Sequence, residues 1–243
     1  MTIKTADVRY TDGALSCNGF LAHEDAGTAR RPGVLVVHEA FGLGEHAMNR
    51  ARMVAELGYV AFAADLFGDR RQVGPAELST VIGGLMANPG VLRQRAKAAL
   101  ASLAAQPQVD PSRLFAIGFC FGGTTVLELA RAGCDLLGVV GFHSGLQTAA
   151  PAAAGAIRAS ILTLIGADDP IIPPEQRAAF EQEMRLAKAD WQMVLYGNTV
   201  HSFTNPAADG KLMPGVLYDA EADRRSWLAM RRFFEERLQV APR

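Results

Sequence analysis

A cysteine between two glycines is the residue of this sequence best placed to act as a nucleophile. Gly118, Cys120 and Gly122 have the spacing G-x-C-x-G, between an apolar run at 114–118 and a helical pattern. A sharp strand-to-helix turn strains the central residue and requires glycine at the flanking positions. The helix N-terminus stabilises a thiolate at Cys120, and the N–H of Phe121 is free to bind an oxyanion. The alternative is a small core cysteine in a tight turn, which predicts no chemistry.

A nucleophile of this kind needs a base, and His201 has the position in the chain that fits. Where a nucleophile stands on such a turn, the order along the chain is nucleophile, acid, histidine. His201 lies in a loop after the last predicted strand, whereas His143 ends the strand that follows Cys120 and comes too early. The acid is Asp168 or Asp169, which follow the run at 161–165; either carboxylate could orient the imidazole.

The elements that position these residues alternate between strands and helices. Apolar, β-branched runs predict strands at 34–37, 59–64, 114–118, 136–142, 161–165 and 193–196. Helical patterns cover 46–57, 91–105, 124–132, 174–188 and 221–238. This alternation predicts a parallel sheet with right-handed crossovers. Residues 2–23 predict an antiparallel hairpin with a turn at Asp12-Gly13, and without a linker we expect one domain over residues 1–243.

Composition excludes several classes of protein. Of 243 residues, 49% are hydrophobic, and 24 Lys and Arg against 25 Asp and Glu give a net charge of −1. This balance argues against partners among nucleic acids and membrane surfaces. The three cysteines lack disulfide spacing and the first ten residues lack an apolar leader, so we expect a cytoplasmic protein. Neither metal-ligand spacing nor a dinucleotide fingerprint occurs, so we expect no metal and no cofactor.

Five ordered motifs resemble those of one enzyme family. They lie at 37–43 (Val-His-Glu-Ala-Phe-Gly-Leu), 64–68 (Ala-Asp-Leu-Phe-Gly), 118–123 (Gly-Phe-Cys-Phe-Gly-Gly), 166–173 (Gly-Ala-Asp-Asp-Pro-Ile-Ile-Pro) and 201–203 (His-Ser-Phe). The sequence resembles the dienelactone hydrolases, or carboxymethylenebutenolidases, of the α/β-hydrolase fold. The resemblance implies an α/β protein whose mostly parallel central sheet is flanked by helices and carries an antiparallel N-terminal edge hairpin.

The resemblance also implies roles for single residues. The family's acid stands three residues after the glycine and four before the proline, which selects Asp169 over Asp168. Glu39 corresponds to a carboxylate that holds the thiol in a resting state until substrate displaces it. Like-charge repulsion between a carboxylate and a thiolate makes this role physically reasonable. The N–H of Ala40 would be the second oxyanion donor beside Phe121.

The sequence departs from the family at a substrate-binding position. Members that act on dienelactone carry an arginine two residues beyond the His-Ser-Phe stretch, where this chain has Asn205. Losing that arginine weakens binding of an anionic substrate, so dienelactone itself is doubtful as the substrate. The candidate substrate contacts are Phe41, His143, Phe203 and Asn205.

The expected activity is hydrolysis of small carboxylic esters or lactones. Cys120 attacks the carbonyl, a thioester forms, and His201 activates water to release the acid. Two other classes stay open. One is a thiol redox or peroxide sensor, because an accessible thiolate is also oxidisable. The other is a non-catalytic binding module on a hydrolase scaffold.

Overall fold

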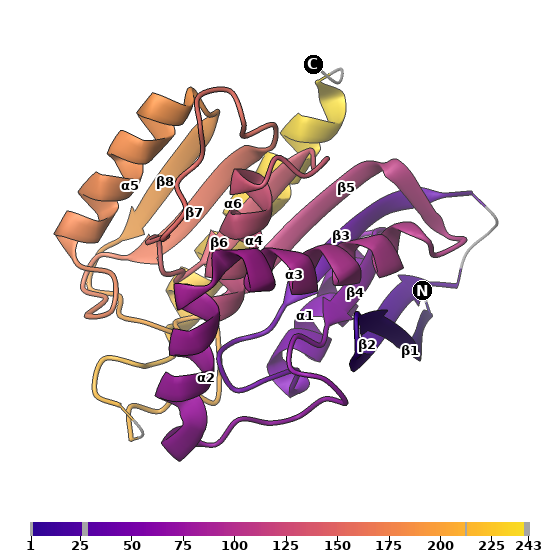
Figure 1. The fold of residues 1–243 in the computed structure, drawn as a ribbon, viewed down its shortest axis with the longest axis horizontal. Coiled ribbons are helices and arrows are strands. Elements are labelled where there is room, and N and C mark those ends of the chain that lie inside the picture. Colours follow the sequence, from indigo (N-terminus) through magenta and orange to yellow (C-terminus); the bar gives the residue numbers. More distant parts are fainter. Residues whose placement is uncertain (1, 26–28, 212, 241–243) are drawn as a thin grey trace.

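The apolar runs form an eight-stranded, mostly parallel sheet (Figure 1). The computed structural model describes residues 2–25, 29–211 and 213–240. The strands are β1 (Ile3–Asp12), β2 (Leu15–Glu24), β3 (Arg31–Val37), β4 (Val60–Ala64), β5 (Val109–Phe119), β6 (Gly138–Phe142), β7 (Ser160–Gly166) and β8 (Trp191–Tyr196). Their order across the sheet is β1-β2-β4-β3-β5-β6-β7-β8. The hairpin β1–β2 is antiparallel and β2 joins β4 antiparallel, while the pairs from β4 to β8 are parallel.

Helices cover both faces of this sheet. They are α1 (Glu45–Glu56), α2 (Pro75–Ala87), α3 (Pro89–Ala104), α4 (Phe121–Arg131), α5 (Pro174–Ala187) and α6 (Ala220–Gln239). Alternate residues of the strands point to opposite faces, so the core divides into two clusters. One cluster joins α3, α4 and α5 to one face of the sheet, and the other joins α1 and α6 to the opposite face. Figure 1 shows the same two layers of helices around the sheet.

The predicted α/β fold class is confirmed, with one helix missed. The sequence patterns indicated the hairpin, the other six strands and five of these helices. The missed helix is α2, which contains Gly83 and Gly84 and buries a single side chain, Leu85. Two glycines weaken helix propensity, and a helix with little buried surface has no clear apolar stripe to detect. Among the described residues, no helix has the length and apolar character needed to span a membrane.

A buried network of charges fixes the helix that follows β5. Arg131, at the end of α4, bonds to Glu128 on the same helix at 3.0 Å and to Glu183 of α5 at 2.7 Å. Its guanidinium also donates to the carbonyl oxygen of Leu146 at 2.7 Å, and Arg93 of α3 pairs with Glu128 at 2.8 Å. Buried charges are tolerated when they are paired in this way. The network ties α4 to α3, α5 and the loop after β6.

The parallel strands bring five loops to one edge of the sheet. The loops after β3, β5, β6, β7 and β8 carry Glu39, Cys120, His143, Asp169 and His201 respectively. Open α/β sheets bind ligands at this carboxyl edge. These five residues therefore lie where a ligand site is expected.

Candidate active site

Cys120 stands on the turn between β5 and α4 in a strained backbone conformation. Its φ is +53° and its ψ is −117°, a backbone conformation that residues other than glycine rarely adopt. A Cβ atom added to Gly118 would lie 2.0 Å from the carbonyl oxygen of Gly122, and one added to Gly122 would lie 2.2 Å from that of Val37. Both glycines are therefore required by close backbone approach. The side chain of Cys120 remains partly exposed.

His201 and Asp169 form a buried pair. Nδ1 of His201 lies 2.7 Å from Oδ2 of Asp169, and both side chains are almost completely buried. The other carboxylate oxygen of Asp169 accepts backbone N–H bonds from Ile171 at 2.8 Å and Ile172 at 3.3 Å. Asp168, the other candidate acid, is exposed to solvent. The structure therefore pairs Asp169, not Asp168, with the histidine.

The surroundings of His201 favour its protonated form. Burial by itself lowers the pKa of His201, but Cys120 and the Asp169 carboxylate together raise it to about 10. Nε2, the nitrogen that does not face Asp169, is buried and makes no hydrogen bond to nitrogen or oxygen among the described residues. An imidazole that retains its proton stabilises a neighbouring thiolate. The arrangement therefore suits a thiolate–imidazolium pair.

Glu39 is held by three polar side chains. Its carboxylate accepts hydrogen bonds from Asn205 Nδ2 at 2.6 Å and Ser202 Oγ at 3.2 Å, and lies 3.3 Å from Nδ1 of His46. Burial opposes the charge of this carboxyl, but His46 and the two hydrogen-bond donors lower the pKa of Glu39 below its ordinary value. Glu39 is therefore ionised, and its charge is compensated by these partners.

Two backbone N–H groups are available as oxyanion donors. Phe121 is the first residue of α4, and Ala40 lies in the loop after β3. Among the described residues, neither N–H donates a hydrogen bond to another protein group. N–H groups at the start of a helix lack partners within the helix and point toward any anion placed there.

The four candidate substrate contacts differ in their exposure to solvent. Phe41 and Asn205 are partly exposed at the carboxyl edge of the sheet. His143 and Phe203 have 0% exposed surface, so neither presents an atom that a substrate can touch. For these two residues the structure does not support the expected substrate contact, because both rings are fully buried and pack edge-on against each other, with ring centres 5.1 Å apart.

The site also contains residues that the sequence motifs did not indicate. His46 contacts Glu39, and Arg50 on the same helix donates to the carbonyl oxygen of Thr204 and pairs with Asp223 at 2.7 Å. The spacing of four residues between His46 and Arg50 places them on one face of α1. That spacing is a weak signal, and nothing in the sequence connects it to Glu39.

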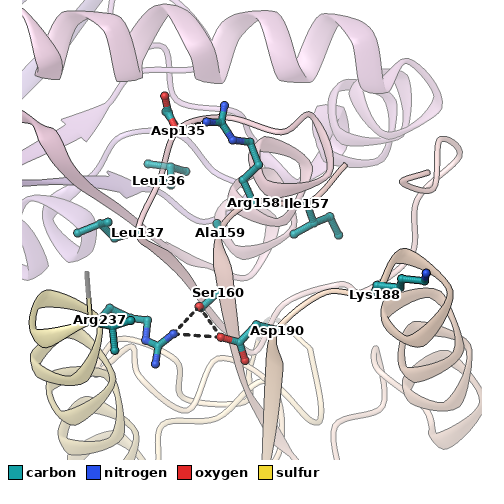
Figure 2. Close-up of a pocket in the computed structure, with 11 residues that line it drawn as sticks. Asp135, Leu136, Leu137, Ile157, Arg158, Ala159, Ser160, Lys188, Asp190 and Arg237 are labelled. Carbon is teal, nitrogen blue, oxygen red and sulfur yellow. Dashed lines mark hydrogen bonds and ion pairs between the residues drawn. The ribbon is translucent and has the colours of Figure 1, made fainter. Parts of the chain in front are cut away.

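A cavity elsewhere in the molecule does not belong to this site. It has a volume of about 270 Å³ and lies at the opposite, amino edge of the sheet, where β6, β7 and β8 begin. Figure 2 shows Arg237 bonded there to Ser160 and Asp190, both at 3.0 Å. Lys188 and Arg158 also line it. The parallel sheet separates this cavity from Cys120.

Comparisons with known proteins agree with the fold and the motifs. The model of the dienelactone hydrolase family matches residues 17–238. The dienelactone hydrolase-like promiscuous phosphotriesterase P91 from metagenomic libraries is 47% identical, with a TM-score of 0.93 over 97% of this chain and 99% of that chain. A Salmonella typhimurium protein named "Putative carboxymethylenebutenolidase" is 30% identical over 89% of this chain and 82% of its own length.

A more distant structure supports the fold alone. Dienelactone hydrolase from Anabaena variabilis is 19% identical, with a TM-score of 0.68 over 95% of this chain and 99% of that chain. The family match covers most of the chain and includes the segments that carry Cys120, Asp169 and His201. The chain belongs to the dienelactone hydrolase family and is a hydrolase with the α/β-hydrolase fold.

Proposed function

We propose that this hydrolase cleaves small carboxylic esters or lactones, with Cys120 as the nucleophile. The observation that carries the proposal is the buried His201–Asp169 pair, 2.7 Å apart, beside a partly exposed cysteine on a strained turn. A thiol becomes a strong nucleophile when an adjacent base takes its proton and a third group orients that base. The raised pKa of His201 supports this assignment, because the ring keeps the proton it receives.

The proposed reaction is an acyl transfer in two steps. The thiolate of Cys120 attacks the carbonyl carbon, and the N–H groups of Phe121 and Ala40 bind the oxyanion. The C–S bond forms, the C–O bond to the alcohol breaks, and His201 gives its proton to the departing oxygen. His201 then takes a proton from water, which attacks the thioester; the C–S bond breaks, releasing the carboxylic acid and restoring the thiolate.

Glu39 is proposed to support this site from the loop after β3. A free carboxylate beside Cys120 would oppose thiolate formation. Its contacts with His46, Ser202 and Asn205 offset that repulsion. The same contacts join the loop after β3, which supplies the Ala40 N–H, to the loop that carries His201. Displacement of Glu39 by substrate would require these three contacts to break.

The substrate we expect is uncharged. Asn205 stands where the resemblance places an arginine, and its amide is already bonded to Glu39. Arg70 and Arg71 are ion-paired with carboxylates of β1 and α2, at 2.5 Å and 2.6 Å. An anionic substrate would have to compete with these carboxylates for either arginine. Neutral esters meet no such cost.

Substitution of Cys120 tests the proposal. With a neutral aryl ester, Cys120→Ala should lose roughly 10⁴-fold or more in kcat, and Cys120→Ser should also lose most activity, because a hydroxyl ionises far less readily. Cys134→Ala is the matched control and should be fully active. Mass spectrometry with an activated ester should show one acyl group on Cys120. Turnover by a folded Cys120→Ala variant would overturn the assignment.

The two alternatives considered from the sequence predict other results. A redox sensor that forms a disulfide needs a second thiol near Cys120, but Cys134 lies beyond the far end of α4, whose 11 residues span about 16 Å. Cys17 is buried, which raises its pKa to about 11. A sensor would form a disulfide or sulfenic acid under mild peroxide without turning over esters. A silent binding module would bind an ester and form no acyl adduct.

A second candidate substrate class is the neutral organophosphate triester. The relative P91, 47% identical, is described as a promiscuous phosphotriesterase. A thiolate and two N–H donors suit attack at a neutral phosphorus centre as well as at a carbonyl. An assay of a chromogenic phosphotriester with the same three variants tests this class, and equal rates for the wild type and Cys120→Ala would reject it.

A further inference from the structure

His143 occupies a central position behind the reactive groups. It directly follows β6, is 0% exposed, and has a positive φ of 40°, which is unfavourable for a histidine. Its backbone N–H donates to the carbonyl oxygen of Leu164 in β7 at 2.8 Å. A strained, fully buried polar residue persists only where the surrounding structure fixes it.

Both ring nitrogens of His143 have partners from the two loops that carry the proposed nucleophile and base. Nδ1 accepts a hydrogen bond from the backbone N–H of Cys120 at 3.1 Å. The same N–H also donates to the carbonyl oxygen of Phe142 at 3.0 Å. The ring proton is therefore on Nε2, which lies 2.8 Å from Oγ1 of Thr204 and donates to it. The ring joins the β5–α4 turn to the loop after β8.

Thr204, which accepts the hydrogen bond from Nε2 of His143, is itself held by α1. The carbonyl oxygen of Thr204 accepts from Arg50 and lies 3.2 Å from Nε2 of His46, both on α1. The ring of His143 also packs edge-on against His201, with ring centres 5.1 Å apart. A shift of His143 would therefore move Cys120 and His201 relative to each other.

The surroundings keep His143 neutral. Burial lowers the pKa of His143 well below its ordinary value, and electrostatic interactions with His201, His46 and Arg50 act in the same direction. The groups packed around the ring are otherwise uncharged: Thr204, Phe203 and Phe119. A neutral ring with Nδ1 unprotonated is the tautomer that the Cys120 N–H requires.

We propose that His143 is a positioning residue, which holds the backbone of Cys120 and the His201 loop in the alignment needed for proton transfer between Sγ and Nε2. This inference rests on the proposed function, in which Cys120 is the nucleophile and His201 the base. It assigns His143 no contact with substrate and no proton transfer of its own, because the side chain is buried and both nitrogens are occupied.

The test compares three variants of the full chain. His143→Phe keeps the ring volume and removes both hydrogen bonds; His143→Asn keeps an oxygen near the position of Nδ1, able to accept from Cys120; Thr204→Val removes only the outer bond. We expect His143→Phe to lose about 100-fold in kcat, the scale of a 1 Å misplacement, with KM nearly unchanged. His143→Asn should recover at least about 10-fold of this loss, and Thr204→Val should lose roughly 5- to 10-fold.

A second readout separates positioning from folding alone. The rate at which iodoacetamide alkylates Cys120 is measured against pH, with thermal unfolding recorded for each variant. We expect the reactive form of Cys120 to appear at a pH about one unit higher in His143→Phe, because the sulfur and the imidazole no longer face each other. A purely structural residue would lower the unfolding midpoint and leave this profile unchanged.

The outcomes are distinguishable from failure of the proposed function. Suppose that Cys120→Ala is inactive, while His143→Phe folds and has a normal kcat and an unchanged alkylation profile. That result overturns this inference and leaves the proposed function standing. An active Cys120→Ala overturns the proposed function and this inference with it. If His143→Phe does not fold, Thr204→Val decides, and a normal kcat with a normal profile in that variant overturns the inference.

Discussion

The two histidines beside Cys120 have their pKa values shifted in opposite directions by their neighbours. His201 faces an acidic partner on each side, Asp169 and Cys120, and its pKa is raised to about 10. His143, 5.1 Å away, is bonded to an N–H group and a hydroxyl, and burial lowers its pKa. Divergent pKa values of adjacent groups are typical of acid–base sites. One ring suits proton transfer and the other a fixed hydrogen-bond geometry.

Glu39 offers a test at the scale of one residue. Glu39→Gln keeps the side-chain size but removes the charge that faces His46 and Asn205, and one of the two acceptor oxygens becomes a donor. We expect kcat to fall roughly 10-fold, because charged hydrogen bonds fix the loops that carry Ala40 and His201. Ester kinetics measure this, with Glu45→Gln on the exposed face of α1 as control. An unchanged kcat would show that Glu39 contributes nothing to the reaction.

The backbone conformation of Cys120 is set by the turn from β5 to α4. Here the N-terminus of α4 lies against β3 so closely that a Cβ on Gly122 would be 2.2 Å from the backbone oxygen of Val37. Backbone cannot move aside as a flexible side chain does, so only glycine allows this approach. The partial positive charge of the helix terminus is thereby brought to the sulfur.

Gly122→Ala tests this packing. The added methyl group must push α4 away from β3, and we expect the free energy of unfolding to fall by about 1–3 kcal/mol or more, with loss of most ester hydrolysis. The matched control is Gly83→Ala in α2, where a Cβ would meet nothing within 4 Å. Alanine in a helix interior is preferred over glycine by up to about 1 kcal/mol, so this variant should be no less stable. Urea unfolding measures both, and equal stability of the two variants would contradict the argument.

At the scale of the whole molecule, buried neutral histidines make stability depend on pH. Burial lowers the pKa of both His143 and His38 in the folded protein. Below pH about 6.5 the unfolded chain protonates these histidines and the folded protein does not, so the unfolded state binds more protons. These two histidines therefore contribute fully to the free energy of unfolding above pH about 6.5, and their contribution is lost as the pH falls below that value.

Urea unfolding between pH 7.5 and 5 measures this effect. We expect the free energy of unfolding to fall below pH 6.5 by at most about 1.4 kcal/mol per pH unit for each of the two histidines. His38→Gln should reduce the slope, whereas His23→Gln, in the partly exposed part of β2, should not. A free energy that stays constant from pH 7 to pH 5 would contradict the prediction.

Local pattern explains which parts of the fold could be predicted. The strands of the parallel sheet were visible because burial on both faces demands continuous apolar runs, as in Val60–Ala64. Helix α2 was not visible, because it has little buried surface and contains two adjacent glycines. That Cys120, Asp169 and His201 lie at the same edge of the sheet could be predicted, because parallel strands deliver successive loops to one edge.

The sequence by itself determined the fold class, the glycines of the β5–α4 turn and the loops that carry Cys120, Asp169 and His201, because these follow from local composition and spacing. Only the tertiary structure decided that Asp169 and not Asp168 faces His201, that Glu39 is bonded to side chains 163 and 166 residues away, and that His143 lies buried behind the site. Such contacts depend on how distant segments pack, and local spacing carries no information about them.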